Sequence, residues 1–308
     1  MTALISVVIP SFANHEGLST VLDRIAGQDS GPVYEVIVVV DRDDPDPEAA
    51  EKAIAGRSPS VRQLQGPRPG ASANRNAGWR AASASLVLFI DNDTLPTPSL
   101  VREHLEWHRR YPDQMLAVLG HVRWARSVRV TPFMRWLDQG IQFDYPGIRG
   151  IDAGWGRFYS ANISVKRAML ERLGGFDEQR FPYGYEDLDL AYRARDLGLR
   201  VFYNREAVVE HLRAYDLEFF RRRVRRIAAA EHEFVRAHPD VPPFFFNLFT
   251  DAASRRPASG RGRHLTRWLP RSTPLLGERA WSSADLYFAQ ALAPEFLSAW
   301  ESAGSGPK

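Results

Sequence analysis

The central motif of the sequence is an apolar run followed at once by acidic residues, Leu86-Val87-Leu88-Phe89-Ile90-Asp91-Asn92-Asp93. A short, uninterrupted apolar run bounded by polar residues predicts a strand that is buried on both faces. Such strands are typical of parallel sheets, which bind ligands beyond the carboxyl ends of their strands. We therefore expect Asp91 and Asp93 at a ligand-binding edge of a sheet.

The segments before this motif alternate between apolar runs and amphipathic stretches. Strands are predicted over residues 5–10, 34–40 and 60–65, and helices over residues 16–26, 47–55 and 71–82. Strands that alternate with helices predict an α/β fold with a mostly parallel central sheet. The expected class is thus doubly wound and Rossmann-like, with helices on both faces of the sheet.

Composition narrows the class of protein and the kind of metal site. A chain of 308 residues with 44% hydrophobic content can bury one sizeable core and an appended subdomain. Without cysteine it has no disulfides, zinc–thiolate sites or thiol nucleophiles, so Mg²⁺ or Mn²⁺ bound by oxygen and imidazole is the metal that fits. No apolar stretch approaches the roughly 18 to 20 residues of a spanning helix, so we expect a cytoplasmic protein. A net charge of +3 does not indicate a nucleic-acid partner.

A second acidic cluster follows an aromatic and glycine-rich stretch and reads Glu186-Asp187-Leu188-Asp189. Two acidic clusters suit group transfer, because one holds a metal-bound phosphate and the other supplies a carboxylate base. Asp189 and Arg193, one helical turn apart, are expected to form a structural pair. An Asp-x-Asp pair is a weak signal by itself, but its position directly after a strand strengthens it.

Several motifs in order make the sequence similar to family 2 glycosyltransferases of the GT-A fold. The matching segments are residues 7–12, 38–41, 73–78, 89–93, 158–162, 173–178 and 185–193. They read VVIPSF, VVVD, ANRNAG, FIDND, FYSAN, LGGFDE and YEDLDLAYR. The resemblance covers about residues 4–215 and implies an inverting transfer of a sugar from a nucleoside-diphosphate sugar, assisted by Mn²⁺ or Mg²⁺.

The resemblance also implies a nucleotide site, made by Pro10, Ser11, Phe12, Asp41, Arg75, Asp91 and Asn92. The first three would line the base pocket, and Asp41 would hydrogen-bond the pyrimidine imide, which favours a UDP-sugar. Arg75 would lie near the base and the diphosphate, where a guanidinium bridges anionic oxygens. The family usually has two acids and then Gly-Ser at the second strand, whereas Arg42, Asp43 and Asp44 follow Asp41 here. A dTDP- or GDP-sugar is therefore the alternative donor.

Catalytic, metal and acceptor residues follow from the same resemblance. Asp187 would be the base that deprotonates the acceptor hydroxyl, and Glu186 would bind acceptor or donor hydroxyls. The implied metal ligands are Asp93, His211 and Asp91. Trp155, Tyr183 and Tyr185 flank the base and are expected either on the acceptor side or in the core. The acceptor is left open among a glycan, a lipid-linked sugar, a metabolite and a natural product.

The last third of the chain shows no resemblance to the family. We expect a catalytic domain over residues 1–212 and a helical extension over residues 213–308, with a mobile linker near 254–263 and a disordered tail from 302. Arginines between apolar residues predict a basic amphipathic helix beginning near Leu217. This helix either packs on the core with a solvated arginine face, or contacts an acidic acceptor or, peripherally, the anionic inner face of a membrane. The oligomeric state is not indicated.

Two other functions are compatible with parts of the pattern. The segment around Asp91 also looks like the nucleophile motif of haloacid-dehalogenase-like phosphatases, but these place it on their first strand and need a downstream lysine. A non-catalytic nucleotide-sugar-binding or scaffold protein would keep the fold. The presence of Asp91, Asp93, Asp187 and His211 favours an enzyme instead.

Overall fold

The computed structural model describes residues 3–30, 34–57, 61–259, 261–267, 271, 273 and 275–305. The chain forms two compact units, Met1–Val128 with Ile148–Arg213 and Arg129–Gly147 with Ala214–Lys308. The division of the chain into a catalytic domain (1–212) and a helical extension (213–308) stays a prediction. The structure adds that residues 129–147, inside the predicted catalytic domain, group with the C-terminal helices.

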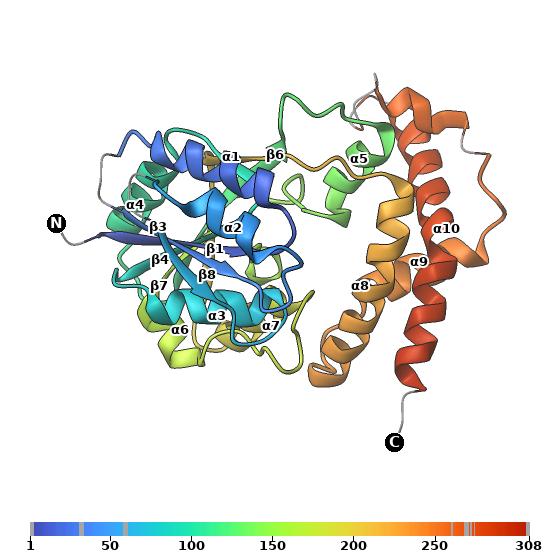
Figure 1. Ribbon diagram of the computed structural model, residues 1–308. Coiled ribbons are helices and arrows are strands. Elements are labelled where there is room, and N and C mark those ends of the chain that lie inside the picture. Colours follow the sequence, from blue (N-terminus) through green and yellow to red (C-terminus); the bar gives the residue numbers. More distant parts are fainter. Residues whose placement is uncertain are drawn as a thin grey trace. The chain divides into compact units, whose positions relative to one another are not determined.

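The first unit contains an eight-stranded sheet in the order β3-β2-β1-β4-β7-β6-β8-β5 (Figure 1). The strands are β1 (Ile5–Ser11), β2 (Tyr34–Val40), β3 (Val61–Gln65), β4 (Leu86–Ile90), β5 (Thr94–Pro96), β6 (Leu116–Trp124), β7 (Asn162–Lys166) and β8 (Arg200–His211). The pairs β1–β2, β1–β4, β2–β3 and β6–β8 are parallel. Strand β7 runs antiparallel to β4 and β6, and β5 runs antiparallel to β8. The predicted α/β class with a mostly parallel sheet is confirmed.

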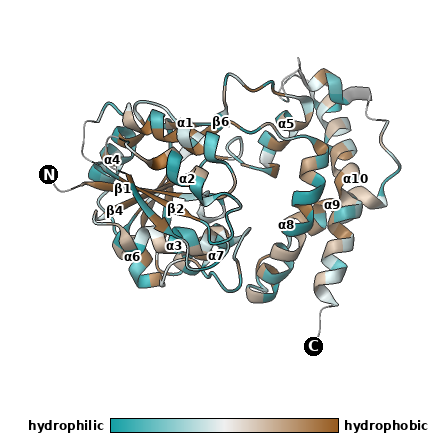
Figure 2. Cartoon of the chain, viewed as in Figure 1, coloured by the Kyte–Doolittle hydropathy of each residue, from teal (hydrophilic) through white to brown (hydrophobic). Residues whose placement is uncertain are grey.

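Helices surround this sheet and account for its apolar strands. They are α1 (His15–Ala26), α2 (Pro47–Ile54), α3 (Ala71–Ala81), α4 (Leu100–Arg110), η2 (Trp155–Arg157), α6 (Arg167–Leu173) and α7 (Glu186–Arg195). In Figure 1, α1, α2 and α4 are drawn on one side of the strands, and α3, α6 and α7 on the other. The strands β1, β2 and β4 are hydrophobic and almost fully buried (Figure 2), as expected for strands covered on both faces.

Strand direction brings the predicted site residues to one edge of the sheet. Ser11 ends β1, Asp41 follows β2 and Asp91 follows β4, and these parallel strands end at the same side. Antiparallel β7 begins at that side, where Asn162 pairs with Ile90. His211 pairs with Thr94 at the end of β8.

The second unit is helical and has an aromatic core. It comprises α5 (Pro132–Trp136), the π-helical turn η1 (Leu137–Ile141), α8 (Leu217–Ala237), α9 (Phe244–Ser254), η3 (Arg261–Arg267) and α10 (Leu276–Gly304). The ring of Phe133 packs against Trp136, Phe220 and Phe288, with centroids 5.2–5.7 Å apart. The carboxylate of Glu231 accepts the backbone N–H groups of Phe245 and Phe246, both at 2.8 Å, and so caps α9. The core of this unit therefore combines rings of the predicted helical extension with Phe133 and Trp136 of the predicted catalytic domain.

The predicted linker, residues 254–263, begins at the end of α9 and reaches into η3. The side-chain amide of Gln290 in α10 donates to the carbonyls of Arg255 and Arg256 in this segment and of Ala252 in α9, so the described start of the linker is anchored. The prediction of a disordered tail is wrong for residues 302–304, which are helical, while residues 306–308 lie outside the described residues.

In the part of the chain that the structure describes, no helix is long and apolar enough to cross a bilayer.

Candidate active site

The end of β1 and the loop that follows carry the predicted base-pocket residues and are tied to the Asp91–Asp93 loop. The Ser11 hydroxyl accepts the side-chain amide of Asn92 at 3.1 Å, and the amide of Asn14 donates to the Asn92 carbonyl at 3.0 Å. Pro10 is half-buried in β1, whereas the Phe12 side chain is 55% exposed. An exposed aromatic ring beside this edge is suited to stacking on a planar base.

Asp44 holds the same loop in place from the other side. Its carboxylate accepts the backbone N–H of Ala13 at 2.9 Å and lies 3.1 Å from His15 Nε2. Ala13 adopts a φ of +50°, which is unfavourable for a residue with a side chain. Asp44, part of the segment that departs from the usual family pattern, thus stabilises a strained turn next to Phe12.

Asp41 is buried and already has three hydrogen-bond donors. Its Oδ1 accepts from the Asp43 N–H at 3.0 Å, and its Oδ2 accepts from Gly70 N–H at 2.8 Å and Asn74 Nδ2 at 2.7 Å. The carboxylate therefore joins the end of β2 to the start of α3. At most one lone pair of Oδ1 is left for a nucleobase, so the predicted contact with the imide is not the main role the geometry gives Asp41.

Arg75 connects the two acidic clusters. Its Nη1 donates to Glu186 Oε1 at 2.8 Å and its Nη2 donates to Asp91 Oδ1 at 3.0 Å. The residue is only 4% exposed. Within the described residues, Arg75 Nε and Glu186 Oε2 are buried and have no hydrogen-bond partner. Burial and the neighbouring Asp93 raise the pKa of Asp91, while Arg75 opposes this rise.

Asp187 lies in the first turn of α7 and is set up as a proton acceptor near neutral pH. Its Oδ2 accepts the Ser160 N–H at 3.3 Å, and its Oδ1 accepts the Leu188 N–H at 2.9 Å. Burial, and next the charge of Glu186, raise the pKa of Asp187 to about 7, against the opposing charge of Arg75. A carboxylate with this pKa is half ionised at neutral pH, which is the condition for an efficient general base.

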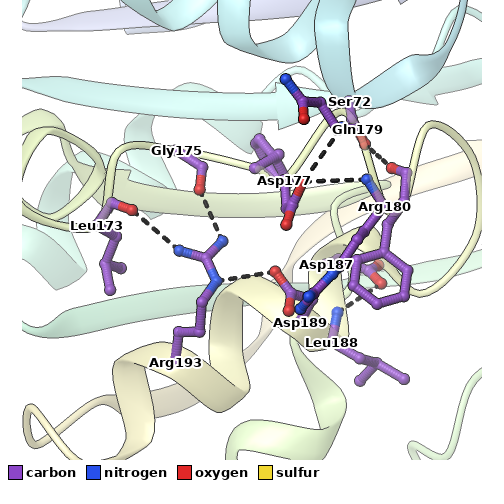
Figure 3. A network of polar contacts seen from close by, with 12 residues as sticks. Ser72, Leu173, Gly175, Asp177, Gln179, Arg180, Asp187, Leu188, Asp189 and Arg193 are labelled. Atoms are coloured by element: carbon purple, nitrogen blue, oxygen red, sulfur yellow. Dashed lines mark hydrogen bonds and ion pairs between the residues drawn. The ribbon is translucent and has the colours of Figure 1, made fainter. Parts of the chain in front are cut away.

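The start of α7 is fixed by its backbone and by an arginine farther along the helix. Tyr185, the N-cap, has a φ of +63° and follows Gly184 with a φ of +86°. Arg193 donates to Asp189 at 2.8 Å, to the Leu173 carbonyl at 2.9 Å and to the Gly175 carbonyl at 2.8 Å (Figure 3). The predicted pair of Asp189 and Arg193 is present, and it ties α7 to the turn after α6.

The predicted metal ligands separate into a facing pair and one residue engaged elsewhere. Asp93 Oδ2 lies 3.7 Å from His211 Nε2, while Asp91 pairs with Arg75. The backbone N–H of Arg213 donates to His211 Nδ1 at 3.1 Å, which places the proton of a neutral ring on Nε2. An ion at Nε2 would displace this proton. Among the described residues, no group of three or more acids and histidines is placed to hold an ion. A carboxylate and an imidazole are nevertheless a donor set that suits Mn²⁺, provided that a ligand supplies the remaining oxygens.

The predicted acceptor-side aromatics have different environments. The Trp155 ring meets Tyr192 of α7 edge-on, with centroids 5.6 Å apart. Tyr183 is 40% exposed, and Tyr185 is half-buried at the N-cap of α7. Trp155 and Tyr185 therefore lie next to the helix that carries Asp187. Their contact with an acceptor stays a prediction.

Some contacts at this site could not be found from the sequence. Ser160 donates to Asp187, and Asn74 and Gly70 donate to Asp41, although the sequence predicts no role for these three residues. Gly70 has a φ of +113°, and a Cβ there would come within 2.5 Å of the Pro182 carbonyl oxygen. The available signal was their place within or beside the short motifs that carry the resemblance.

A mostly parallel sheet with an acid-rich edge, next to a helix that begins with two acids, defines an α/β protein of the GT-A type. Residues 3–230 match the family model for "Glycosyltransferase like family 2", and the chain belongs to this family. The match supports the glycosyltransferase resemblance along the whole sheet-bearing unit. The family match leaves the phosphatase alternative without support. The position of Asp91, directly after the fourth strand rather than the first, also argues against that alternative.

Similar proteins include validoxylamine A glucosyltransferase from Streptomyces hygroscopicus subsp. limoneus, 26% identical over 288 residues. That alignment covers 80% of this chain and 60% of the relative. A second validoxylamine A glucosyltransferase, from Streptomyces hygroscopicus subsp. jinggangensis, is 25% identical, with 80% of this chain and 64% of the relative covered. The chain thus spans less than two thirds of the length of these curated relatives.

Solved structures share the fold at lower identity. The mannosyltransferase PcManGT from Pyrobaculum calidifontis, in complex with GDP-Man and Mn²⁺, superposes with a TM-score of 0.57 at 19% identity, covering 100% of this chain and 77% of that one. S. aureus TarS 1-349 in complex with UDP gives a TM-score of 0.54 at 15% identity, covering 98% and 92%. These likenesses show the GT-A fold.

Proposed function

We propose that this chain is a metal-assisted, inverting glycosyltransferase that moves a sugar from a nucleoside-diphosphate sugar to an acceptor hydroxyl. The observation that carries the proposal is the meeting of the two acidic clusters at Arg75, which binds Asp91 and Glu186. A donor-side carboxylate and a base-side carboxylate held by one cation give a site in which both halves of the reaction can take place. Family membership supports the same class of chemistry.

In the proposed reaction Asp187 takes the proton of the acceptor hydroxyl. The acceptor oxygen then attacks the anomeric carbon with its freed electron pair, from the face opposite the diphosphate. The bond from that carbon to the diphosphate oxygen breaks, and the nucleoside diphosphate leaves with the bonding pair. The anomeric configuration is therefore inverted. Glu186, adjacent to the base, is proposed to bind a hydroxyl of donor or acceptor through Oε2, its unpaired oxygen among the described residues.

The protein supplies only some of the ligands that a metal ion at this site would need. Asp93 and His211 are the residues proposed to hold Mn²⁺ or Mg²⁺, and a bound ion supplies charge stabilisation to the departing diphosphate. With two protein ligands, the donor's phosphate oxygens have to complete the shell, as is usual for these cations at phosphate sites. We therefore expect weak metal binding without nucleotide.

The donor is proposed to be a UDP-sugar, with GDP- or dTDP-sugars as alternatives. TarS has been captured with UDP and PcManGT with GDP-Man, so the shared fold accommodates more than one base. Phe12 and Asn92 with Ser11 line the edge where a base is expected, while Asp41 is largely consumed by its own contacts. Stacking rather than a carboxylate contact should therefore contribute most to base binding.

The test begins with calorimetric binding of UDP, dTDP and GDP, each with and without Mn²⁺. Metal-dependent binding of one nucleotide, weakened in Asp93→Ala, supports the donor site and identifies the base. The next step is release of that nucleotide from its sugar conjugates by the wild type and by Asp187→Asn. A variant that retains the wild-type rate would remove Asp187 from the mechanism, and a wild type that binds no nucleotide would favour a scaffold role.

A further inference from the structure

We infer that Arg75 is a positioning residue, which sets the geometry of the Glu186–Asp187 pair against Asp91 rather than binding the donor's phosphates. The inference rests on the proposed function. It changes the role that the resemblance implied for Arg75, because both terminal nitrogens of its guanidinium donate to carboxylates of the protein and the side chain is almost fully buried.

The guanidinium is enclosed as well as paired. Arg75 lies 6.0 Å over the ring centroid of Phe176, and almost none of its side chain reaches solvent. The planar fork of arginine holds two acceptors at a fixed angle, which a flexible point charge such as lysine cannot do. Each terminal nitrogen keeps a second N–H beyond these bonds, but the side chain is only 5% exposed, so a phosphate could approach the guanidinium only if the groups around it moved. Displacement of Glu186 or Asp91 would leave a carboxylate without its counter-charge.

Helix α3, which carries Arg75, is bound along its length to the loop that leads to α7. Asn76 exchanges two hydrogen bonds with the backbone of Phe176, at 2.9 and 3.0 Å. The Ser72 hydroxyl donates to the Phe181 carbonyl, and Asn74 donates to Asp41 at the end of β2. Helix α3 therefore holds Arg75 in a fixed position, and the position of Glu186 depends on α3.

Charge at Arg75 also acts on the neighbouring base. Asp187 faces Glu186 from its own helix, Arg75 from α3 and the backbone N–H groups of Ser160 and Leu188. Burial and then Glu186 raise the pKa of Asp187, and Arg75 lowers it. Loss of the guanidinium should therefore keep Asp187 protonated to higher pH and delay the rise of the transfer rate.

The test compares Arg75→Met, Arg75→Lys and the control Arg80→Met, an exposed arginine on the same helix. UDP affinity with Mn²⁺ is measured by calorimetry, and UDP release from UDP-glucose with water as acceptor is followed against pH. If the wild type prefers GDP, the probes are GDP and GDP-mannose. We expect Arg75→Met to keep nucleotide affinity within about threefold while turnover falls at least about tenfold and the rate profile moves to higher pH. Arg75→Lys should keep the wild-type profile but recover only part of the turnover.

A second readout needs no turnover. Arg75→Met should lower the thermal unfolding midpoint more than Arg80→Met, and adding Glu186→Gln should recover part of the loss, because a buried carboxylate no longer lacks a counter-ion. Should Arg75→Met not fold, Arg75→Lys carries the test: a fall in turnover with unchanged nucleotide affinity supports the inference.

Two results would overturn the inference about Arg75, and a third would overturn the proposed function on which it rests. Loss of nucleotide affinity in step with turnover would overturn the inference and return Arg75 to the donor site. Unchanged turnover with an unchanged pH profile would overturn it too. A wild type that binds none of the nucleotides with Mn²⁺ would instead overturn the proposed function.

Discussion

Replacement of Asp187 by asparagine should make the protein more stable and less active, and the gain in stability should depend on pH. The pKa of this carboxyl rises from the ordinary value of 3.8 to about 7, first because of burial and then because of Glu186. The folded state thus binds the proton more tightly than the unfolded state. Wild-type stability therefore falls as pH rises from about 4 to about 7, and the full penalty remains above that.

The size of the effect follows from the shift. Between about pH 5.5 and pH 7 the penalty grows by about 2 kcal/mol at 1.36 kcal/mol per unit, and partial access of water reduces this to about 1 kcal/mol. Asp187→Asn does not titrate, so its stability relative to the wild type should increase by about 1–2 kcal/mol between about pH 5.5 and pH 8.

Denaturant unfolding of both proteins at the two pH values measures this difference, and release of nucleotide from the donor sugar measures turnover. We expect turnover to fall by about 10²–10⁴-fold, the usual contribution of a general base. Nucleotide binding should persist, which shows that the variant is folded. A stability difference that is the same at both pH values, or wild-type turnover in the variant, would refute the reasoning about Asp187.

Other predictions concern pH, the metal and backbone geometry. The kcat/KM of donor turnover should rise with pH around a midpoint of about 7 and then level off, because Asp187 must be ionised; a flat profile from about pH 5 to 9 would contradict this. Mn²⁺ should improve UDP affinity at least about tenfold in the wild type but not in Asp93→Ala, as measured by calorimetry, with equal metal dependence in both as the contrary result. Gly70→Ala should destabilise the protein by about 2–4 kcal/mol in chemical unfolding, because its Cβ would meet Pro182, whereas Gly174→Ala, which also has positive φ but open space, should cost about 1 kcal/mol. Equal costs at the two glycines would show that Gly70 is not packed as described.

Local sequence predicted the strands near the N-terminus well. The run from Tyr34 to Val40 forms β2 at the predicted bounds, and Leu86–Ile90 forms β4, because largely apolar runs of this length fit a buried strand and are too short for a typical buried helix. The pairing of the strands was harder to predict from the sequence. The antiparallel insertion of β7 between β4 and β6 depends on contacts between segments far apart in the chain, which local periodicity does not encode.

The candidate site shows the same limit. Motif order identified Asp91, Arg75 and Glu186 as functional candidates, and the structure brings them together. Motif order did not reveal that Arg75 donates to a carboxylate 111 residues downstream, rather than to a phosphate of the donor. Nor could it show that Asp41 is occupied by Gly70 and Asn74, since hydrogen-bond saturation depends on how loops pack in space.

The grouping of residues 129–147 with the C-terminal helices has a consequence for protein engineering. The chain passes between the two units at residues 128–129, 147–148 and 213–214, so the helical unit is not a simple appendage. Truncation after Arg213 would leave Phe133 and Trp136 without Phe220 and Phe288, and the exposed aromatic rings would promote aggregation. Exchange of this unit between related enzymes therefore has to move residues 129–147 and the C-terminal segment together.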